Sequence, residues 1–287
     1  MEDIRAEAGN ASDDGLVALA ASVDWLDADA QTAAQRHAGR PGGVLHELAG
    51  WFAGVRGHYP PPAPTRVRLV RCGGAAEPVD ALAAQAGVGV RAESFGSLAE
   101  GVALADAEVD AGCDLMIVTG RVNDDTAALA VSALARAEPV AVLPRGAAAV
   151  DTKAWIARAE FVRDRRAALV EVRDEPDEVL TVLADDAVAG VCGLIVRATA
   201  RRTAVILDGD LAVTAALVAH SVQPRCALWW RVADTSTSPI QAKALEAFRQ
   251  QPVLDLRIDT HDGIAALLVL AALRTAVELA TADHAGE

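Results

Sequence analysis

Aromatic residues are scarce in this sequence, and basic residues are outnumbered by acidic ones. Phe, Trp and Tyr make up 3% of the 287 residues, and 26 Lys and Arg stand against 40 Asp and Glu, a formal net charge of −14. Nucleic acids and anionic membranes bind clustered cations, and stacking on bases needs aromatic rings. We therefore expect neither partner, and a phosphorylated small molecule would need a local reversal of the charge.

The usual metal-binding and cofactor-binding motifs are also missing. The four cysteines lie far apart, without a CxxC pair or a histidine at ligand spacing: Cys72, Cys113, Cys192 and Cys226. Such cysteines are typical of buried free thiols rather than of a metal site. The sequence has no P-loop, GxGxxG or serine-elbow motif. We expect no metal and no cofactor.

Long apolar runs and targeting segments are not found either. The longest apolar stretch, 263–273, is interrupted by Arg274 and is shorter than the roughly 20 residues of a membrane span. The first residues are acidic, unlike the basic start of a secretory signal. These features predict a cytoplasmic protein without membrane contact.

What the sequence does contain is 52% apolar residues in an alternating pattern. After the proline-rich spacer 60–64, short β-branched runs alternate with longer Ala-rich stretches, a pattern typical of parallel βαβ units. The fold class we predict is α/β, with a doubly wound, mostly parallel, Rossmann-like sheet. The predicted strands are 66–70, 87–91, 115–119, 139–143, 204–207 and 227–230.

Helical patterns at 45–55 and 263–280 lie on either side of this unit, and we expect them to pack together as a small helical lobe. The expected division is 1–62 for the N-terminal helical segment of the lobe, 63–262 for the α/β domain and 263–287 for the C-terminal helix. Ligands of such folds bind beyond the carboxyl ends of the strands, so the loops there hold the candidate site residues.

Two of these loops suggest anion or cation binding. After the third strand, Gly120 is followed by Asp124, Asp125 and Thr126 at the start of a helix. An aspartate that caps the helix explains the acidic pair, and a metal or amine site is the alternative. Arg145 and Gly146 follow the next predicted strand, where they could bind phosphate or form a turn with a solvated arginine.

Two further loops carry carboxylates and hydroxyls. Asp208 and Gly209, with Asp210, end a strand and are expected to cap the helix 211–220. Asp234 and Ser236 belong to a hydroxyl-rich run that could hold a polar ligand or cap the next helix, which has proline in its first turn.

A last polar run, 255–263, contains the adjacent residues His261 and Asp262. An imidazole beside a carboxylate suits general acid–base chemistry because the imidazole titrates near neutrality. Adjacent side chains need not face one another, so a solvated loop is the alternative.

Several stretches resemble one enzyme family. Residues 204–209 and 214–217 resemble "P-V-L-L-D-G-F…T-A-A-A-L", 244–256 resembles "A-L-E-A-L-G-L-E-P-L-L-D-L", and 40–51 resembles "K-P-P-G-S-L-G-R-L-E-E-L-A-x-W". These are motifs of the nicotinate-nucleotide–dimethylbenzimidazole phosphoribosyltransferase family, which acts in cobalamin lower-ligand synthesis. The resemblance implies a Rossmann-like domain with a small helical lobe, and a homodimer.

The functional motifs of that family are altered in this chain. "G-E-G-S-G-A", whose Glu is the general base, falls on 261–266, so Asp262 replaces the Glu. The phosphate loop "G-E-M-G-I-G-N-T-T" falls on 119–127, where Gly120 replaces the acidic residue and Thr126 is kept. "G-R-G-T-G" falls on 144–148, and "H-R-S-A-E-P-G-H" on 234–241, where Ser236 is kept. "A-G-D-H-G-V" has no counterpart near residues 70–74.

The resemblance implies that an azole nitrogen displaces nicotinate at the ribose C1 of nicotinate mononucleotide. Asp262 and His261 are the catalytic candidates, and the substrate-binding candidates are Gly120, Asp124, Asp125, Thr126, Arg145, Gly146, Asp208, Gly209, Asp234 and Ser236. Two carboxylates near a phosphate are unfavourable, which predicts weakened or lost activity. The alternatives are a non-catalytic partner or regulatory subunit in a heterodimer with a full-length homologue, and a new small-molecule site at Asp124, Asp125 and Asp234.

Overall fold

A five-stranded, all-parallel sheet forms the centre of the molecule, in a computed structural model that describes residues 15–37, 43–73, 77–144 and 151–285. The strands are β1 (Val67–Cys72), β2 (Val88–Glu93), β3 (Leu115–Gly120), β4 (Ala204–Asp208) and β5 (Trp230–Val232), in the order β2-β1-β3-β4-β5. All residues of β3 and β4 are buried, as expected of central strands covered on both faces. The predicted α/β fold with a parallel sheet is confirmed.

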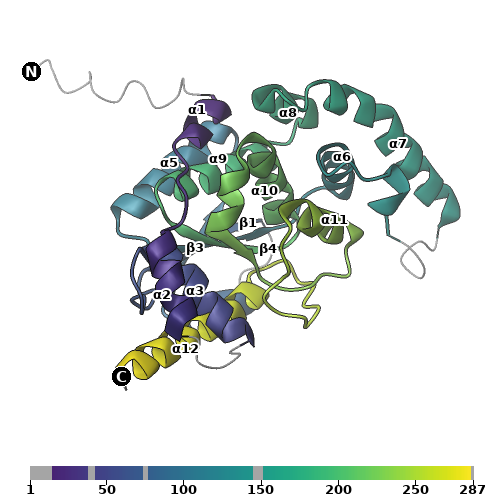
Figure 1. Ribbon diagram of the computed structural model, residues 1–287. Coiled ribbons are helices and arrows are strands. Elements are labelled where there is room, and N and C mark those ends of the chain that lie inside the picture. Colours follow the sequence, from purple (N-terminus) through teal and green to yellow (C-terminus); the bar gives the residue numbers. More distant parts are fainter. Residues whose placement is uncertain (1–14, 38–42, 74–76, 145–150, 286–287) are drawn as a thin grey trace, which may run out of the picture.

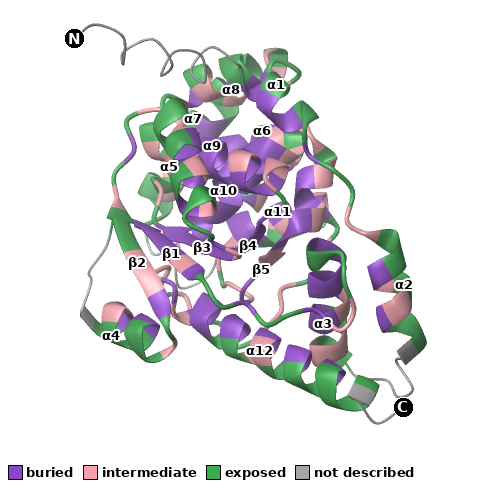
Figure 2. Ribbon diagram, turned by 90° about the vertical axis from the view of Figure 1, so that its left-hand side faces the viewer, coloured by how far each residue is buried: buried purple, intermediate pink, exposed green. Residues whose placement is uncertain are grey.

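Helices cover both faces of this sheet (Figures 1 and 2). One face carries α5 (Leu98–Asp110), α6 (Asp124–Leu134), α9 (Asp186–Ala200), α10 (Asp210–Val222) and α11 (Pro239–Phe248). The other face carries α3 (Gly43–Arg56), α4 (Glu77–Gln85) and α12 (Ile264–Ala285). The remaining helices, α1 (Leu16–Ala21), α2 (Ala28–His37), α7 (Thr152–Glu171) and α8 (Pro176–Leu183), lie farther from the sheet.

The two helices expected near the chain ends, α3 and α12, contact each other, and α12 also contacts β4 and α4. Arg274 lies midway along α12 and donates a hydrogen bond from Nη1 to the carbonyl of Ala86, at 2.6 Å. The helix continues past Arg274, so it is longer than the apolar stretch 263–273 of the sequence. By length and composition Ile264–His284 could cross a membrane, but half of its most apolar window is buried inside the molecule, as in a core helix.

Two predicted strands are wrong. Residues 139–143 hold a 3-10 helix, Pro139–Ala141, and β3 pairs directly with β1 and β4, so no strand lies between β3 and β4. Val142 and Leu143 are apolar because they are buried in the core. Of the stretch 227–230, only Trp230 is in β5, since Pro224 opens a 3-10 helix that runs to Trp229.

The tightest helix contact joins α5 to α9. A Cβ atom on Gly101 would lie 1.7 Å from the carbonyl oxygen of Gly190, so only glycine allows the two backbones to approach this closely. Beside it, Asp106 on α5 accepts hydrogen bonds from Arg197 of α9 at 2.8 Å and from Arg201, the C-cap residue of α9, at 2.6 Å. This interface therefore combines close packing with fully paired charges.

Candidate functional site

Gly120, Gly209 and His261 meet beyond the carboxyl ends of β3 and β4. A Cβ atom on Gly209, whose φ is 92°, would lie 2.9 Å from the Cβ of His261 and 3.0 Å from the carbonyl oxygen of Gly120. A Cβ on Gly120 would lie 2.6 Å from the carbonyl oxygen of Cys72. No side chain fits at either glycine, and the loop that carries His261 reaches the strand ends for this reason.

Asp210, the first residue of α10, is the centre of a small polar group. Its N–H donates to Nδ1 of His261 at 3.4 Å, and its Oδ2 accepts a hydrogen bond from the Ser238 hydroxyl at 3.2 Å. Burial raises the pKa of Asp210, and the nearby His261 partly opposes this rise. Because Nδ1 of His261 is an acceptor, the neutral imidazole carries its proton on Nε2. His261 therefore offers a hydrogen-bond donor to a ligand.

The predicted capping of α10 by Asp208-Gly209-Asp210 is wrong. Gly209 is the N-cap residue and no side chain caps the helix there. Asp208 instead lies on β4 beneath the start of α12, where its Oδ2 accepts a hydrogen bond from the N–H of Ala266 at 3.3 Å. Burial raises the pKa of Asp208 to about 7, and the negative charges of Asp262 and Asp234 add to the rise.

Asp262 lies in the loop just before α12, two residues ahead of Ile264. Its Oδ1 accepts hydrogen bonds from the Thr260 hydroxyl at 2.7 Å and from the N–H of Ile264 at 3.2 Å. The start of α12 thus gathers two carboxylates, Asp262 in the loop and Asp208 in the core. A helix N-terminus favours negative charge, and paired carboxylates with different surroundings are a common arrangement for acid–base chemistry.

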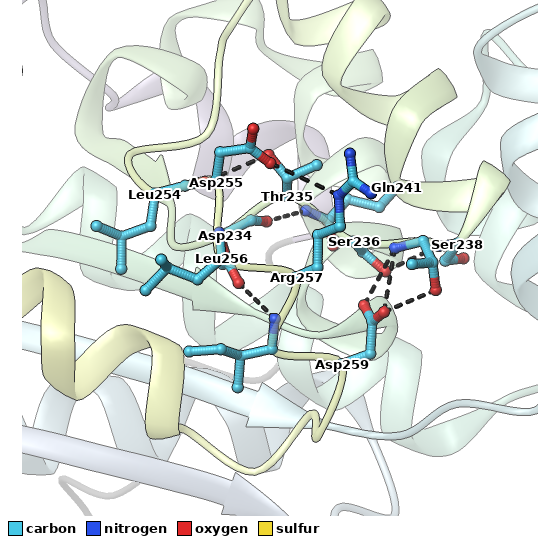
Figure 3. A network of polar contacts seen from close by, with 12 residues as sticks. Asp234, Thr235, Ser236, Ser238, Gln241, Leu254, Asp255, Leu256, Arg257 and Asp259 are labelled. Carbon is cyan, nitrogen blue, oxygen red and sulfur yellow. Dashed lines mark hydrogen bonds and ion pairs between the residues drawn. The ribbon is translucent and has the colours of Figure 1, made fainter.

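Asp234 holds the loop that leads to these residues (Figure 3). Its two carboxylate oxygens accept hydrogen bonds from the N–H groups of Leu256 at 2.7 Å and Ile258 at 2.6 Å, and its carbonyl accepts one from the Gln241 side chain. Both oxygens are therefore engaged within the protein. A contact of Asp234 with substrate stays a prediction, and so does the polar site proposed for it.

A second carboxylate, Asp259, fixes the next part of the loop. It accepts hydrogen bonds from the hydroxyl of Thr237 at 2.6 Å and from its N–H at 3.2 Å. Partial burial opposes ionisation, but the hydrogen bonds from Ser236 and Thr237 outweigh it and lower the pKa of Asp259. The oxygen of Ser236 also accepts from the N–H of Ser238 at 2.9 Å. Within the described structure, the hydroxyl-rich run therefore forms hydrogen bonds with Asp259 and with its own backbone, which hold this loop in place.

The start of α6 differs from the expected capping. Asn123 is the N-cap residue, and its Oδ1 accepts from the N–H of Asp125 at 2.8 Å, whereas Asp124 and Asp125 lie in the first turn. Arg158 on α7 pairs with Asp125 at 2.7 Å and approaches Asp124 at 3.7 Å. The acidic pair is therefore partly neutralised. An Asn before two Asp is a capping signal that could have been recognised in the sequence.

The remaining candidates fall into two groups, and one further residue contacts the site. Thr126 lines a cavity of about 270 Å³ between α6, α7 and α8, away from His261. Arg145 and Gly146 lie outside the described residues. Arg121, which was not predicted, donates from Nη2 to the carbonyl of Thr260 at 3.0 Å and so contacts the His261 loop.

The four cysteines are buried and free, as predicted. Burial raises the pKa of Cys72, at the end of β1, to about 12, so this thiol is not a nucleophile at neutral pH. Within the described ranges, no three His, Cys, Asp or Glu side chains gather in a way that could hold a metal ion. The chemistry available at the strand ends is that of carboxylates, one imidazole and hydroxyls.

Comparison with known proteins agrees with this geometry. A family described as phosphoribosyltransferase matches residues 85–286. The nicotinate-nucleotide–dimethylbenzimidazole phosphoribosyltransferase of Mycobacterium avium (strain 104) is 31% identical over 311 residues, covering 85% of this chain and 89% of the relative. Its namesake from Mycobacterium ulcerans (strain Agy99) is 37% identical over 200 residues, covering 68% of this chain and 56% of the relative.

Among solved structures, CobT from Thermus thermophilus has the same fold, with a TM-score of 0.74 and 19% identity over 88% of this chain and 96% of that one. A second structure from the same organism, of a nicotinate-nucleotide–dimethylbenzimidazole phosphoribosyltransferase, gives a TM-score of 0.73. The motifs, the matched length and the shared fold all point to one family. The chain therefore belongs to the nicotinate-nucleotide–dimethylbenzimidazole phosphoribosyltransferase family.

Proposed function

We propose that this chain transfers the phosphoribosyl group of nicotinate mononucleotide to an azole such as dimethylbenzimidazole. The observation that carries the proposal is the pair of carboxylates, Asp208 and Asp262, at the start of α12 in a chain of this family. Such a pair can remove a proton from a nitrogen heterocycle without a metal or a cofactor.

In the reaction, a nitrogen lone pair of the azole attacks C1 of the ribose. The bond from C1 to the nicotinate nitrogen breaks, and its electron pair returns to the pyridine ring. The N–H proton of the azole moves to Asp262, whose Oδ1 is held by Thr260 and Ile264. Oδ2 is then the oxygen that accepts the proton, since it is not committed to the helix cap.

Two other residues support this step. Asp208 is buried behind Asp262 with a pKa raised to about 7 by burial, so its charge changes in the range where the reaction would run, and the rate is expected to follow it. His261 presents its Nε2–H towards a ligand because Asp210 occupies Nδ1. We assign to His261 a hydrogen bond to the anionic substrate rather than proton abstraction.

The predicted weakening of activity becomes part of this proposal in a milder form. Gly120 takes the place of the acidic residue of the phosphate loop, and this loss should weaken activity. The negative charge of Asp124 and Asp125 is less unfavourable than expected, because Arg158 neutralises part of it. We expect slow turnover rather than none. No observation favours a role as a non-catalytic or regulatory subunit, and homodimer formation and a cytoplasmic location stay predictions.

The test is to incubate the purified protein with nicotinate mononucleotide and dimethylbenzimidazole and to measure ribazole phosphate by mass spectrometry. General-base catalysis is worth about 10²–10⁴-fold, so Asp262→Asn should lower turnover by at least about 100-fold, and Asp262→Glu should raise it above the wild type. Asp255→Asn, in the same loop, changes a solvated carboxylate; it is the matched control and should retain most of the activity.

Two results would contradict the proposal. The absence of any product from the wild-type protein, with folding verified by circular dichroism, argues against the transfer itself. Product formation that is indifferent to Asp262→Asn keeps the reaction but moves the base elsewhere, with Asp208 the next residue to test.

A further inference from the structure

Among the residues that the structure describes, one carboxylate oxygen of the candidate site has no hydrogen-bond partner. Asp210 is 9% exposed, and its Oδ2 is bonded to Ser238, but its Oδ1 is shielded from water and makes no hydrogen bond in the described structure. Buried polar atoms are almost always paired, and an unpaired one costs about 1–3 kcal/mol. An unpaired acceptor at a site is therefore a position where a ligand can supply the missing donor.

The surroundings of Asp210 define what that ligand can be. His261 and Ser238 already use the N–H and Oδ2 of Asp210, and both hold the residue in place. The nearby charges of Asp124 and Asp259 raise the pKa of Asp210 further, after burial itself. An anionic group would be repelled here, whereas a neutral hydroxyl or N–H group would donate to Oδ1 without adding charge.

We propose that Oδ1 of Asp210 accepts a hydrogen bond from a hydroxyl or N–H donor of the substrate, which makes Asp210 a specificity-determining residue of this site. The inference rests on the proposed function and deepens it. The donor has two possible sources, a ribose hydroxyl of the nucleotide or a polar substituent on the azole. In the family motif "D-G-F" the position of Asp210 is aromatic, so this acceptor is a property of the present chain.

Thr214 provides a matched comparison on the same helix. It lies four residues after Asp210, hence on the same face of α10, and its hydroxyl is also unpaired. Thr214 is fully buried, whereas Asp210 keeps some exposure. Asp210 therefore keeps a small exposed surface that Thr214 lacks, so loss of the Thr214 hydroxyl should change stability and leave ligand discrimination unaltered.

The experiment is calorimetric titration of the full chain with two sets of probes. The first set is nicotinate mononucleotide and its analogues that lack the 2′ or the 3′ hydroxyl. The second set is 5-hydroxybenzimidazole and 5-methylbenzimidazole. A hydrogen bond to a charged group is worth about tenfold or more in affinity, so the wild type should bind the hydroxyl-bearing member of one set about tenfold more tightly. The set that shows the difference identifies the source of the donor.

Variants then assign the difference to Asp210. Asp210→Ala should remove the discrimination, Asp210→Asn should restore part of it because one acceptor oxygen is kept, and Thr214→Val should behave as the wild type. The melting temperature of each variant verifies its folding, and the Asn variant provides the measurement if the Ala variant does not fold.

Three outcomes would overturn the inference. Equal affinities within both sets in the wild type, or discrimination that persists in Asp210→Ala, show that the ligand does not donate a hydrogen bond to Oδ1. In either case product formation by the wild type leaves the proposed function intact. Failure of the wild type to bind any of the probes contradicts the inference and the proposed function together.

Discussion

The α5–α9 interface and the junction of β4, α10 and α12 are both built on glycine, yet they differ in how completely their polar atoms are paired. At α5–α9, Gly101 allows backbone contact and Asp106 is bonded to two arginines. At the junction, Gly209 allows the approach of His261, which has a φ of 54°, but Oδ1 of Asp210 stays unpaired. Among the described residues, the α5–α9 interface has no buried side-chain polar atom without a partner, whereas the site keeps one at Asp210.

The largest effect is expected at Asp234, which holds the loop that leads to His261 and Asp262. Asp234→Ala removes two hydrogen bonds between a buried carboxylate and backbone N–H groups, each worth about 1.5–3 kcal/mol. The free energy of unfolding should fall by about 3–6 kcal/mol in urea titrations. Asp255→Ala in the same loop removes a solvated side chain whose ion pair with Arg257 spans 3.9 Å, and it should change stability by less than about 0.5 kcal/mol. Similar losses in the two variants would contradict the structural role of Asp234.

A smaller effect tests the close packing of the framework. Gly101→Ala places a methyl group 1.7 Å from the carbonyl of Gly190, and the helices must separate, which should cost about 1–3 kcal/mol in thermal unfolding. The matched control is Gly50→Ala in α3, where the nearest atom is 3.6 Å away. That variant should gain up to about 1 kcal/mol from helix propensity. If both variants are stabilised, the α5–α9 contact is looser than described.

Substitution of Asp208 should stabilise the protein, unlike Asp234→Ala and Gly101→Ala, because burial at the junction disfavours the charged form of this carboxyl group. Its pKa is raised from 3.8 to about 7 in the folded protein by burial, so the folded state binds more protons than the unfolded state between these values. Its contribution to stability is therefore lost as the pH rises through about 7. Asp208→Asn should be about 1–2 kcal/mol more stable than the wild type at pH 8, with a smaller difference at pH 5. A difference that does not depend on pH would show that Asp208 does not titrate there.

The smallest effect concerns His220, near the C-terminal end of α10. Burial lowers the pKa of His220 below 6.5, and its ring packs edge-on against Phe248 with the centroids 5.5 Å apart. The unfolded state then binds more protons, so the wild type should lose about 1 kcal/mol between about pH 7.5 and pH 5.5. His220→Gln should not show this loss, measured by guanidinium unfolding at both pH values. His46→Gln, half-buried on α3, is the control and should keep the wild-type pH dependence.

The strands of the sheet show what the sequence can and cannot predict. Strands β1, β3 and β4 were predicted to within two residues at each end, because buried parallel strands are continuous apolar runs. The stretch 139–143 has a similar composition but forms a 3-10 helix, while β3 pairs directly with β4, and strand pairing is a property of the whole sheet. The pattern of apolar residues records burial, and it does not record which strand is next to which.

The site was predicted residue by residue but not as an arrangement. Asp262 and His261 were identified from motif and chemistry, whereas the contact of His261 with Asp210 depends on positive φ angles at Gly209 and His261 that no local pattern indicates. Asp210 itself was interpreted as a capping residue. Side chains that meet through loop conformation, rather than through a strand or helix period, are beyond what spacing can show.

Helix α12 has a mechanical consequence for the proposed base. With 22 residues it is about 33 Å long, and Arg274 ties its middle to Ala86 while Asp262 caps one end. A rotation of about 3° about that middle point moves the capped end by about 1 Å, and a misplacement of this size can cost about 100-fold in rate. Substitutions at the contact between α12 and α3 should therefore rotate α12 about its middle and shift the end that Asp262 caps. They should change turnover while leaving the strand ends, and the affinity for nucleotide, almost untouched.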